Sequence, residues 1–296
     1  PPHVQARLGS AKEVEPGVVD MTPIVLENLQ RLGIDDLLTI GGDDTLSYSS
    51  VLHKAGFPIV AVPKTMDNDV PGTEYCIGFS TALTRAADAV RRQRTTIGSH
   101  ERIGIFRIFG RDAGFTALYT AYVASIRCCI PECTFDLEEL IGVLVDDKRN
   151  NPSRYALIVL SEGASWKGRE VQEYGETDAY GHRKKVNVAE ALSDEVKRRS
   201  GEETLVSDLT YDLRSGTPDF LDKMIAYTFA TMAVDCISDR GSGRMMAIRG
   251  GCYADIEIPD PKEGPRRVDI DTMYNRERFR PSYGGKRGLP VFLTRA

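Results

Sequence analysis

The stretch that decides the fold runs from Phe57 to Asp69. Its first part, Phe57-Pro-Ile-Val-Ala-Val62, is apolar, and its second part, Pro63-Lys64-Thr65-Met66-Asp67-Asn68-Asp69, is polar. A short apolar run that ends in such a segment is typical of a buried strand of a parallel sheet and the loop after it. The residues before it predict a strand over 36–40, a turn at 41–45 and a helix to about residue 55. Two strands joined through a helix form a βαβ unit, which predicts a parallel sheet.

The same alternation of helix and strand continues to both sides. Predicted helices span 22–32, 81–94, 113–124, 137–147, 186–199 and 219–237, and predicted strands span 103–108, 125–130, 155–160, 203–209 and 245–248. The segment 163–185, which contains Trp166, is polar and irregular, and we expect it to be a surface excursion. The pattern predicts an α/β protein throughout.

Composition excludes several classes of protein. The chain has 296 residues, of which 27% are charged and 41% hydrophobic, unlike collagen, a disulfide scaffold or a disordered chain. Its formal charge of −5, from 38 basic and 43 acidic residues, argues against duplex nucleic acid as a partner. Membrane-spanning runs and a signal-peptide core are missing from the sequence, so we expect a cytoplasmic protein without membrane contact. The six cysteines lack metal-binding spacing, and we expect most of them to be reduced and buried.

Polar residues gather after four of the predicted strands. In an open parallel sheet, ligands bind beyond the carboxyl ends of the strands, so these segments are the candidate site. They are Gly41-Gly42-Asp43-Asp44-Thr45, Pro63–Asp69, Phe109-Gly110-Arg111-Asp112-Ala113-Gly114 and Ser161-Glu162-Gly163-Ala164.

The first of these segments has the residue types of a phosphate and metal site. The glycine pair Gly41-Gly42 lets backbone N–H groups approach an anion at the start of a helix. Asp43 and Asp44 are carboxylates of the kind that bind Mg²⁺ together with phosphate oxygens. A tight turn followed by acidic helix capping is the simpler alternative.

The second segment has the residue types of phosphoryl transfer to an alcohol. Lys64 and Thr65 supply a cation and a hydroxyl beside the carboxylates of Asp67 and Asp69. One carboxylate can accept the proton of the attacking hydroxyl while the lysine neutralises the transferring group. The alternative is an ordinary solvated loop.

The remaining two segments add groups that recognise sugar phosphates. Arg111 follows a strand and can face a phosphate with its guanidinium, and Glu162 can accept hydrogen bonds from sugar hydroxyls. Each residue alone is an ordinary loop charge. Four such segments, each at a strand end, favour a phosphoryl-transfer site.

These residues resemble a known family. The motifs are Gly41–Thr45, Pro63–Asp69, Gly78-Phe79-Ser80-Thr81-Ala82, His100-Glu101-Arg102, Gly110-Arg111 and Arg214-Ser215-Gly216-Thr217-Pro218. In order and spacing they resemble the phosphofructokinase family from about Leu8 to about Gly251. The resemblance implies an α/β fold of two similar three-layer lobes with mainly parallel sheets. It places the phosphoryl-donor lobe at 1–78 plus 213–263 and the sugar-phosphate lobe at 79–212 plus 264–296.

The resemblance also implies roles for single residues. Asp67 matches the general base that takes the proton of the sugar's 1-hydroxyl, and Asp69 matches its neighbouring acid. Thr65 matches a hydroxyl that contacts the transferred phosphate, and Asp43 the acid that works with Mg²⁺. The other implied contacts with the sugar phosphate are Gly110, Arg111, Glu162, Tyr211 and Arg214. Arg102 matches an arginine that reaches a neighbouring subunit's site, which implies a homodimer or homotetramer with shared sites.

Two positions bear on the phosphoryl donor. Members that use ATP resemble Gly-Gly-Asp-Gly and Pro-Gly-Thr, whereas this chain has Asp44 and Lys64 at the altered positions. Asp44 adds bulk and negative charge where a nucleotide would approach, and Lys64 adds a cation for inorganic phosphate. The pair resembles the pyrophosphate-dependent 6-phosphofructokinases, with Gly42 and Lys12 as further donor contacts. An ATP-dependent enzyme is the alternative.

Some positions depart from the family pattern. Leu205 stands at an arginine position, Tyr211 at a histidine position, and Leu213–Gly216 replaces Gln-Arg-Gly-Gly, so a ketose phosphate other than fructose 6-phosphate stays open. The family's opening strand has no counterpart, and we expect a chain incomplete at its N-terminus. A non-catalytic regulatory paralogue is a further alternative, but Asp67, Thr65 and Arg111 are intact. Kinases of lipids or NAD with a Gly-Gly-Asp motif do not carry Asp67-Asn68-Asp69 in this setting.

Overall fold

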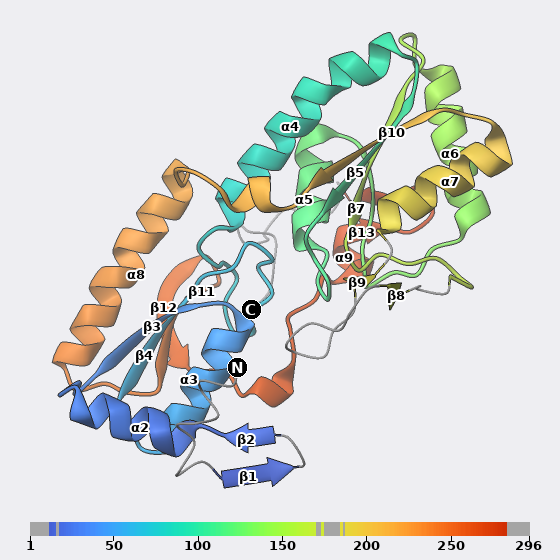
Figure 1. The fold of residues 1–296 in the computed structure, drawn as a ribbon. Helices are drawn as coiled ribbons and strands as arrows, with labels where there is room; N and C mark the ends of the chain where they lie inside the picture. The colour runs from blue at the N-terminus through green and yellow to red at the C-terminus, as the bar shows by residue number, and fades with distance from the viewer. Residues whose placement is uncertain (1–11, 16–17, 170–172, 175–183, 186, 283–296) are drawn as a thin grey trace.

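The structure is a computed structural model that describes residues 12–15, 18–169, 173–174, 184–185 and 187–282. Two four-stranded sheets organise these residues, and helices cover them (Figure 1). The first sheet has the strand order β12-β11-β4-β3, and the second has the order β10-β5-β7-β6. Within the described part of the chain, the helices are all too short or too polar to cross a membrane.

The first sheet lies between two helical layers. It contains β3 (Leu37–Gly41), β4 (Ile59–Pro63), β11 (Arg244–Arg249) and β12 (Cys252–Glu257). The first three are parallel, and β12 runs antiparallel to β11. Side chains of β4 alternate between the faces, as a period of two requires. Val60 and Val62 pack with α8 (Phe220–Ser238), whereas Ile59 and Ala61 pack with α3 (Asp43–Lys54) and α2 (Thr22–Arg31).

The second sheet is parallel throughout. Its strands are β10 (Thr204–Leu209), β5 (Ile103–Ile108), β7 (Ala156–Ser161) and β6 (Arg127–Cys129). Phe106 and Ile108 of β5 pack with α4 (Phe79–Ser99) and α5 (Phe115–Ala124). Ile103 and Ile105 pack on the other face with α6 (Leu137–Asn150) and α7 (Val188–Ser200). The second lobe is therefore also a three-layer unit.

One apolar core joins the two lobes. It runs from Val60 and Val62 of β4 through Phe79 of α4 to Phe106 of β5. We propose that the lobes divide at the boundaries expected from the sequence, 1–78 plus 213–263 and 79–212 plus 264–296. The two sheets support this division, because β3, β4, β11 and β12 fall in the first set of residues and β5, β6, β7 and β10 in the second.

Smaller elements complete the described residues. They are the hairpin of β1 (Lys12–Glu15) and β2 (Val18–Asp20), the pair β8 (Glu173–Tyr174) and β9 (Lys184–Lys185), η1 (Tyr211–Arg214), η2 (Pro261–Glu263), α9 (Ile270–Met273), β13 (Tyr274–Asn275) and β14 (Arg280–Pro281).

The predicted α/β class with mainly parallel sheets is confirmed, but several boundaries move. Helix α4 extends to Ser99, beyond the predicted end at residue 94, because Ile97 returns to the core and is fully buried. Strand β6 is shorter than the predicted 125–130, because Ser125 ends α5 in the left-handed region, with φ 56°. Strand β12 was not predicted. It pairs with β11 after Gly250 and Gly251, whose φ values of 58° and 78° form the turn.

Two further expectations need correction. Trp166 does not lie free on the surface: its ring packs against Phe135, with the centroids 5.9 Å apart, and is partly buried. All six cysteines are free, as expected, but only Cys76, Cys128 and Cys129 are buried. Cys252 is exposed because it lies on the edge strand β12.

Candidate active site

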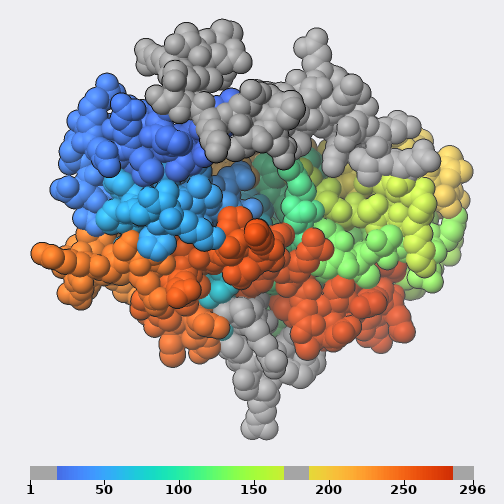
Figure 2. All heavy atoms as spheres, turned by 90° about the horizontal axis from the view of Figure 1, so that it is seen from below, coloured from blue at the N-terminus to red at the C-terminus, as the bar shows by residue number. Residues whose placement is uncertain are grey.

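The candidate site forms where the carboxyl ends of both sheets approach each other. The loops after β3 and β4 come from the first lobe, and those after β5 and β7 come from the second (Figure 1). In Figure 2 the blue segments of the first lobe and the green segments of the second border a depression, with orange-red residues along one side. Each lobe therefore contributes strand ends to the same region.

The segment Lys64–Asp69, which we call the catalytic loop, is fixed from three directions. The Lys64 N–H donates to the Gly41 carbonyl at the end of β3, at 2.7 Å. The Ile77 N–H donates to the Pro63 carbonyl at 3.1 Å, which holds the returning chain. The Thr116 hydroxyl of α5 donates to the Met66 carbonyl at 2.9 Å. The last bond ties the loop to the second lobe.

Asn68 stabilises the turn inside the loop. It adopts a left-handed conformation, with φ 55°, and is fully buried. Its Nδ2 donates to the Glu74 carbonyl at 3.1 Å, and its Oδ1 accepts from the Cys76 N–H at 2.8 Å. Asparagine tolerates this backbone region better than most residues. The side chain between the two aspartates is thus structural, which leaves Asp67 and Asp69 for chemistry.

Asp67 has the environment of a general base. One of its carboxylate oxygens, Oδ1, is buried and has no hydrogen-bond partner among the described residues. Burial raises the pKa of Asp67, and the charges of Glu162 and Asp112 raise it further, whereas Arg214 and Arg111 lower it. These four side chains come from three other loops, so the predicted residues Asp67, Arg111, Glu162 and Arg214 are brought together.

A second group of carboxylates adjoins Asp67. Burial, the charge of Asp67 and the charge of Asp43 raise the pKa of Asp69 to about 7. Burial and the charges of Asp44 and Asp112 also raise the pKa of Asp43. Burial is the largest cause of both shifts, and the neighbouring carboxylates add to it, because like charges at short range disfavour ionisation.

This group suits a divalent cation that also binds phosphate. Among the described residues, no cluster of three or more His, Cys, Asp or Glu side chains could hold a metal ion by itself. Mg²⁺ usually takes one or two protein carboxylates and completes its shell with water and phosphate oxygens. Asp43, with its raised pKa and acidic neighbours, fits such a partial ligand set.

Glycines let the loops pack against one another. A Cβ added to Gly42 would lie 3.3 Å from the Thr65 Cβ, so the loops after β3 and β4 are in contact. A Cβ added to Gly163 would lie 1.9 Å from the Arg111 carbonyl oxygen, and the Gly163 N–H donates to the Gly110 carbonyl at 3.0 Å. Gly110 itself has φ 127°. A side chain at Gly163 would push Arg111 away from the site.

Arg214 and Tyr211 form an aromatic and cationic cluster at the end of β10. The Arg214 guanidinium lies 4.2 Å from the ring centroid of Phe109, and its Nε donates to the Met66 sulfur at 3.4 Å. Tyr211 packs edge-on against Phe109, with the centroids 5.5 Å apart, and is 72% exposed. Arg214 thus contacts the catalytic loop while its position is set by Phe109.

Other predicted site residues lie elsewhere. Arg102 precedes β5, at the end of the strand opposite to Arg111, about 20 Å away along the strand. Lys12 lies in the β1–β2 hairpin, where its backbone is in register with that of Asp20 on the neighbouring strand. Its role in donor binding stays a prediction. Glu162, by contrast, lies in the candidate site: its charge raises the pKa of Asp67, and its carboxylate Oε2 is 3.7 Å from Nη2 of Arg107.

Asp222 is a structural centre that the sequence analysis missed. This buried carboxylate accepts hydrogen bonds from the Gly78 N–H at 2.7 Å, the Thr81 N–H at 2.8 Å and the Tyr75 hydroxyl at 2.6 Å. It therefore joins the start of α8 to the start of α4, next to the chain that follows the catalytic loop. The only sequence signal was the acidic pair Asp219 and Asp222 in a helix start. Phe109 and Asp112 were likewise given no role.

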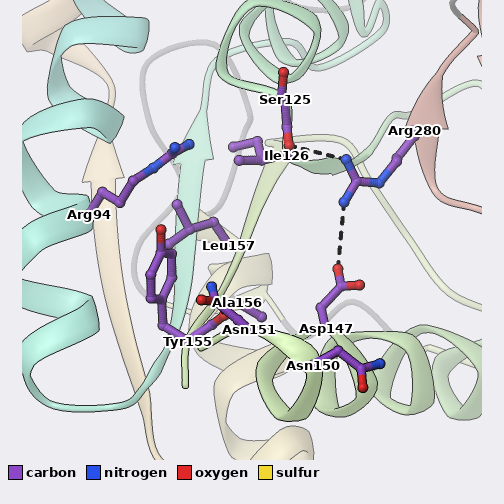
Figure 3. A pocket seen from close by; sticks show the side chains of 10 residues that line it. All are labelled: Arg94, Ser125, Ile126, Asp147, Asn150, Asn151, Tyr155, Ala156, Leu157 and Arg280. Atoms are coloured by element: carbon purple, nitrogen blue, oxygen red, sulfur yellow. Dashed lines mark hydrogen bonds and ion pairs between the residues drawn. The ribbon is translucent and has the colours of Figure 1, made fainter. Parts of the chain in front are cut away.

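A separate pocket of about 290 Å³ lies at the amino ends of strands β6 and β7 of the second sheet (Figure 3). Arg94 of α4, Asp147 of α6, Tyr155 before β7 and Arg280 of β14 line it. Arg280 donates to the Ser125 carbonyl at 3.1 Å and lies 3.7 Å from Asp147. Because β7 begins at this pocket and ends near Glu162, the pocket is not part of the candidate active site.

Comparisons with known proteins agree with this geometry. The family model for Phosphofructokinase matches residues 5–237. The pyrophosphate–fructose 6-phosphate 1-phosphotransferase of Streptomyces coelicolor is 36% identical over 83% of this chain and 72% of its own length. The ATP-dependent 6-phosphofructokinase 3 of that organism is 35% identical over 81% of this chain and 71% of its own length. The chain therefore belongs to the phosphofructokinase family.

A solved structure shows the same fold. The pyrophosphate-dependent phosphofructokinase from Marinobacter aquaeolei superposes with a TM-score of 0.74, at 20% sequence identity, over 92% of this chain and 71% of its own. The expected two-lobed α/β architecture is thus confirmed.

Proposed function

We propose that this protein transfers a phosphoryl group from pyrophosphate to the 1-hydroxyl of fructose 6-phosphate or a related ketose phosphate. The observation that carries the proposal is Asp67, a half-buried side chain with a raised pKa, whose buried Oδ1 has no hydrogen-bond partner among the described residues and which lies near Arg111 and Arg214 from two other loops. A base with phosphate-binding cations around it is what phosphoryl transfer to an alcohol requires.

Each residue has a part in the proposed reaction. Asp67 accepts the proton of the 1-hydroxyl as its oxygen forms the new bond to phosphorus, while the bridging P–O bond of pyrophosphate breaks and phosphate leaves. Arg111 neutralises the transferring group, and Thr65 hydrogen-bonds to it. Glu162 and Gly110 contact the sugar, and Arg214 with Tyr211 contacts its distal phosphate. Positioning and charge stabilisation supply most of the rate.

Mg²⁺ is the proposed cofactor. Asp43 would hold it, with phosphate oxygens completing the coordination, and the ion would neutralise charge on the donor. Asp69 lies near enough to Asp43 for its charge to raise the Asp69 pKa, which supports a shared electrostatic role for the two acids.

Pyrophosphate is favoured as the donor by two exposed side chains. Asp44 lies in the first turn of α3, beside Gly42, and Lys64 follows β4. The carboxylate of Asp44 would repel and obstruct a nucleotide, and the ammonium of Lys64 would hold the end of pyrophosphate. The 35% identity to an ATP-dependent relative is the observation that keeps ATP as the second candidate.

A homo-oligomer with shared sites is part of the proposal. Arg102 lies at the amino end of β5 and cannot reach its own protomer's Asp67 region along that strand. Its position is suited to a sugar phosphate bound by a neighbouring copy.

A coupled assay of the purified full-length protein tests the function. Pyrophosphate or ATP is supplied with Mg²⁺ against fructose 6-phosphate and longer ketose phosphates. We expect turnover with pyrophosphate and a higher kcat/KM for it than for ATP. Turnover only with ATP would replace the donor assignment, and no phosphoryl transfer with either donor would overturn the proposal.

A further inference from the structure

Arg266 contacts the catalytic loop from a distant part of the chain. Its guanidinium Nη2 donates to the Asn68 carbonyl, 198 positions away, and also to the Glu74 carbonyl at 3.4 Å. Its own backbone N–H donates to the Asp69 carbonyl at 2.6 Å. One residue thus holds two consecutive carbonyls of the loop, those directly after Asp67.

The guanidinium of Arg266 is itself fixed. It lies 4.5 Å from the ring centroid of Phe115, the first residue of α5. Its Nε and Nη1 are buried without a hydrogen-bond partner among the described residues, so its position depends on the Phe115 ring and the loop carbonyls. Phe115 belongs to the second lobe, which makes Arg266 a link between that lobe and the loop.

The backbone that Arg266 holds is in an uncommon conformation. Asn68 is in the left-handed region, with φ 55°, which few residues other than glycine and asparagine adopt. Its side chain is anchored to Glu74 and Cys76, and its carbonyl is anchored to Arg266. A turn of this residue would move the carboxylates on both sides of it.

We propose that Arg266 is a positioning residue, which holds the Asp67-Asn68-Asp69 turn in the conformation that aims Asp67 at the substrate hydroxyl. The inference rests on the proposed function only for its catalytic consequence. The positioning itself concerns the loop and can be measured without turnover.

The first measurement compares Arg266→Ala with Arg266→Lys and with the control Arg267→Ala. The control removes the exposed side chain of the next residue along the chain. Misplacement of a catalytic group by about 1 Å costs about 100-fold, so we expect kcat of Arg266→Ala to fall by about 10–100-fold while KM values stay within about threefold. A lysine ammonium cannot reproduce the contact of the planar guanidinium with two carbonyls, so the kcat of Arg266→Lys should lie between those of wild type and Arg266→Ala. Added guanidinium ion should restore part of the kcat of Arg266→Ala and none of that of Arg267→Ala.

The second measurement is amide hydrogen exchange, which is independent of activity. In Arg266→Ala, exchange should quicken for the amides of Asp67 and Cys76, which hydrogen-bond to Thr65 and Asn68, and remain unchanged in β5 and β7. If Arg266→Ala does not fold, Arg266→Lys is measured in the same way. Unchanged exchange in the loop, equal acceleration across the molecule, or a kcat within about threefold of wild type would overturn the inference. An inactive wild-type protein would instead contradict the proposed function, and the exchange result would still decide the positioning.

Discussion

The central and the edge strands of the two sheets differ in how completely they are covered. All six residues of β7 are buried, and so are five of the six residues of β5 and all five residues of β4. On the edges, by contrast, β3 and β10 each have only one buried residue, and Ile40 of β3 is 56% exposed. In the edge strand β12, Ala254 and Ile256 are half-buried and the other four residues are exposed. Arg111, Glu162 and the catalytic loop thus follow enclosed central strands, whereas the segment 41–45 follows the less buried edge strand β3.

The catalytic loop belongs to the first lobe by sequence and to both lobes by contact. It follows β4, but Thr116 and Arg214 hold Met66 from the other side. In the proposed reaction, this arrangement would place the base of one lobe next to a sugar phosphate held by the other. It also means that changes in either lobe should affect turnover in different ways.

The largest expected effect is on turnover at Asp67. Asp67→Asn keeps the shape of the side chain and removes the base, so kcat should fall by about 10²–10⁴-fold. Binding of the sugar phosphate should be largely intact, since Arg214 and Glu162 remain. Steady-state kinetics at saturating substrate measure the first effect, and calorimetric titration with the sugar phosphate measures the second. Near-normal turnover would remove Asp67 from the mechanism.

Stability should separate the central from the edge strands. Ile158 in β7 is fully buried, so Ile158→Ala should lower the free energy of unfolding by about 2–5 kcal/mol. Ile40→Ala, in the exposed part of β3, should cost less than about 1 kcal/mol. Denaturant unfolding of the two variants and wild type makes the comparison. Equal losses would show that the central and the edge strands are covered to the same degree in solution.

Loss of Lys64 should affect one donor only. Lys64→Gly removes a charge-assisted contact worth about 1.5–3 kcal/mol, or about 10–150-fold in kcat/KM for pyrophosphate. The exposed Lys54, which pairs with Asp260, offers the control Lys54→Ala. A loss of the same size in both variants would show that Lys64 has no specific contact with the donor.

The smallest effect is a shift in the pH profile. The base must be ionised, and burial raises the pKa of Asp67 while the pKa of Asp69 is raised to about 7. Activity should therefore fall as the pH drops, with its acid limb above the ordinary range of aspartate. Arg214 lowers the pKa of Asp67, so Arg214→Met should move this limb to higher pH. The control Arg31→Met, in the exposed part of α2, should leave the limb in place; a shift there, or none with Arg214→Met, would contradict the electrostatics.

The fold was predictable where strands are buried on both faces. The run 103–108 was predicted as a strand and forms β5. The prediction succeeded because a mainly apolar segment between polar ones is typical of a strand that is buried on both faces. Strand β12 was missed because only one of its faces is covered, and its polar residues resemble a loop. The end of α4 was missed because exposed arginines hide the return of Ile97 to the core.

The site was predictable where chemistry follows a strand end. Asp67, Arg111 and Glu162 were expected at one edge, and the electrostatics of Asp67 bring them together. The supports of the site were not predictable. Asp222 and Arg266 act on Gly78 and Asn68 across 144 and 198 positions, and such contacts depend on tertiary packing rather than on local pattern.

The donor preference tests the central claim most directly. The measurement is the ratio of kcat/KM for pyrophosphate to that for ATP, at fixed sugar phosphate and Mg²⁺, in full-length wild type and Asp44→Gly. We expect wild type to prefer pyrophosphate, and Asp44→Gly to gain detectable use of ATP, because the change removes a carboxylate and steric bulk from the nucleotide's path. A wild-type protein that uses ATP better than pyrophosphate would contradict the account of Asp44 and Lys64, and the ATP-dependent reaction would replace it.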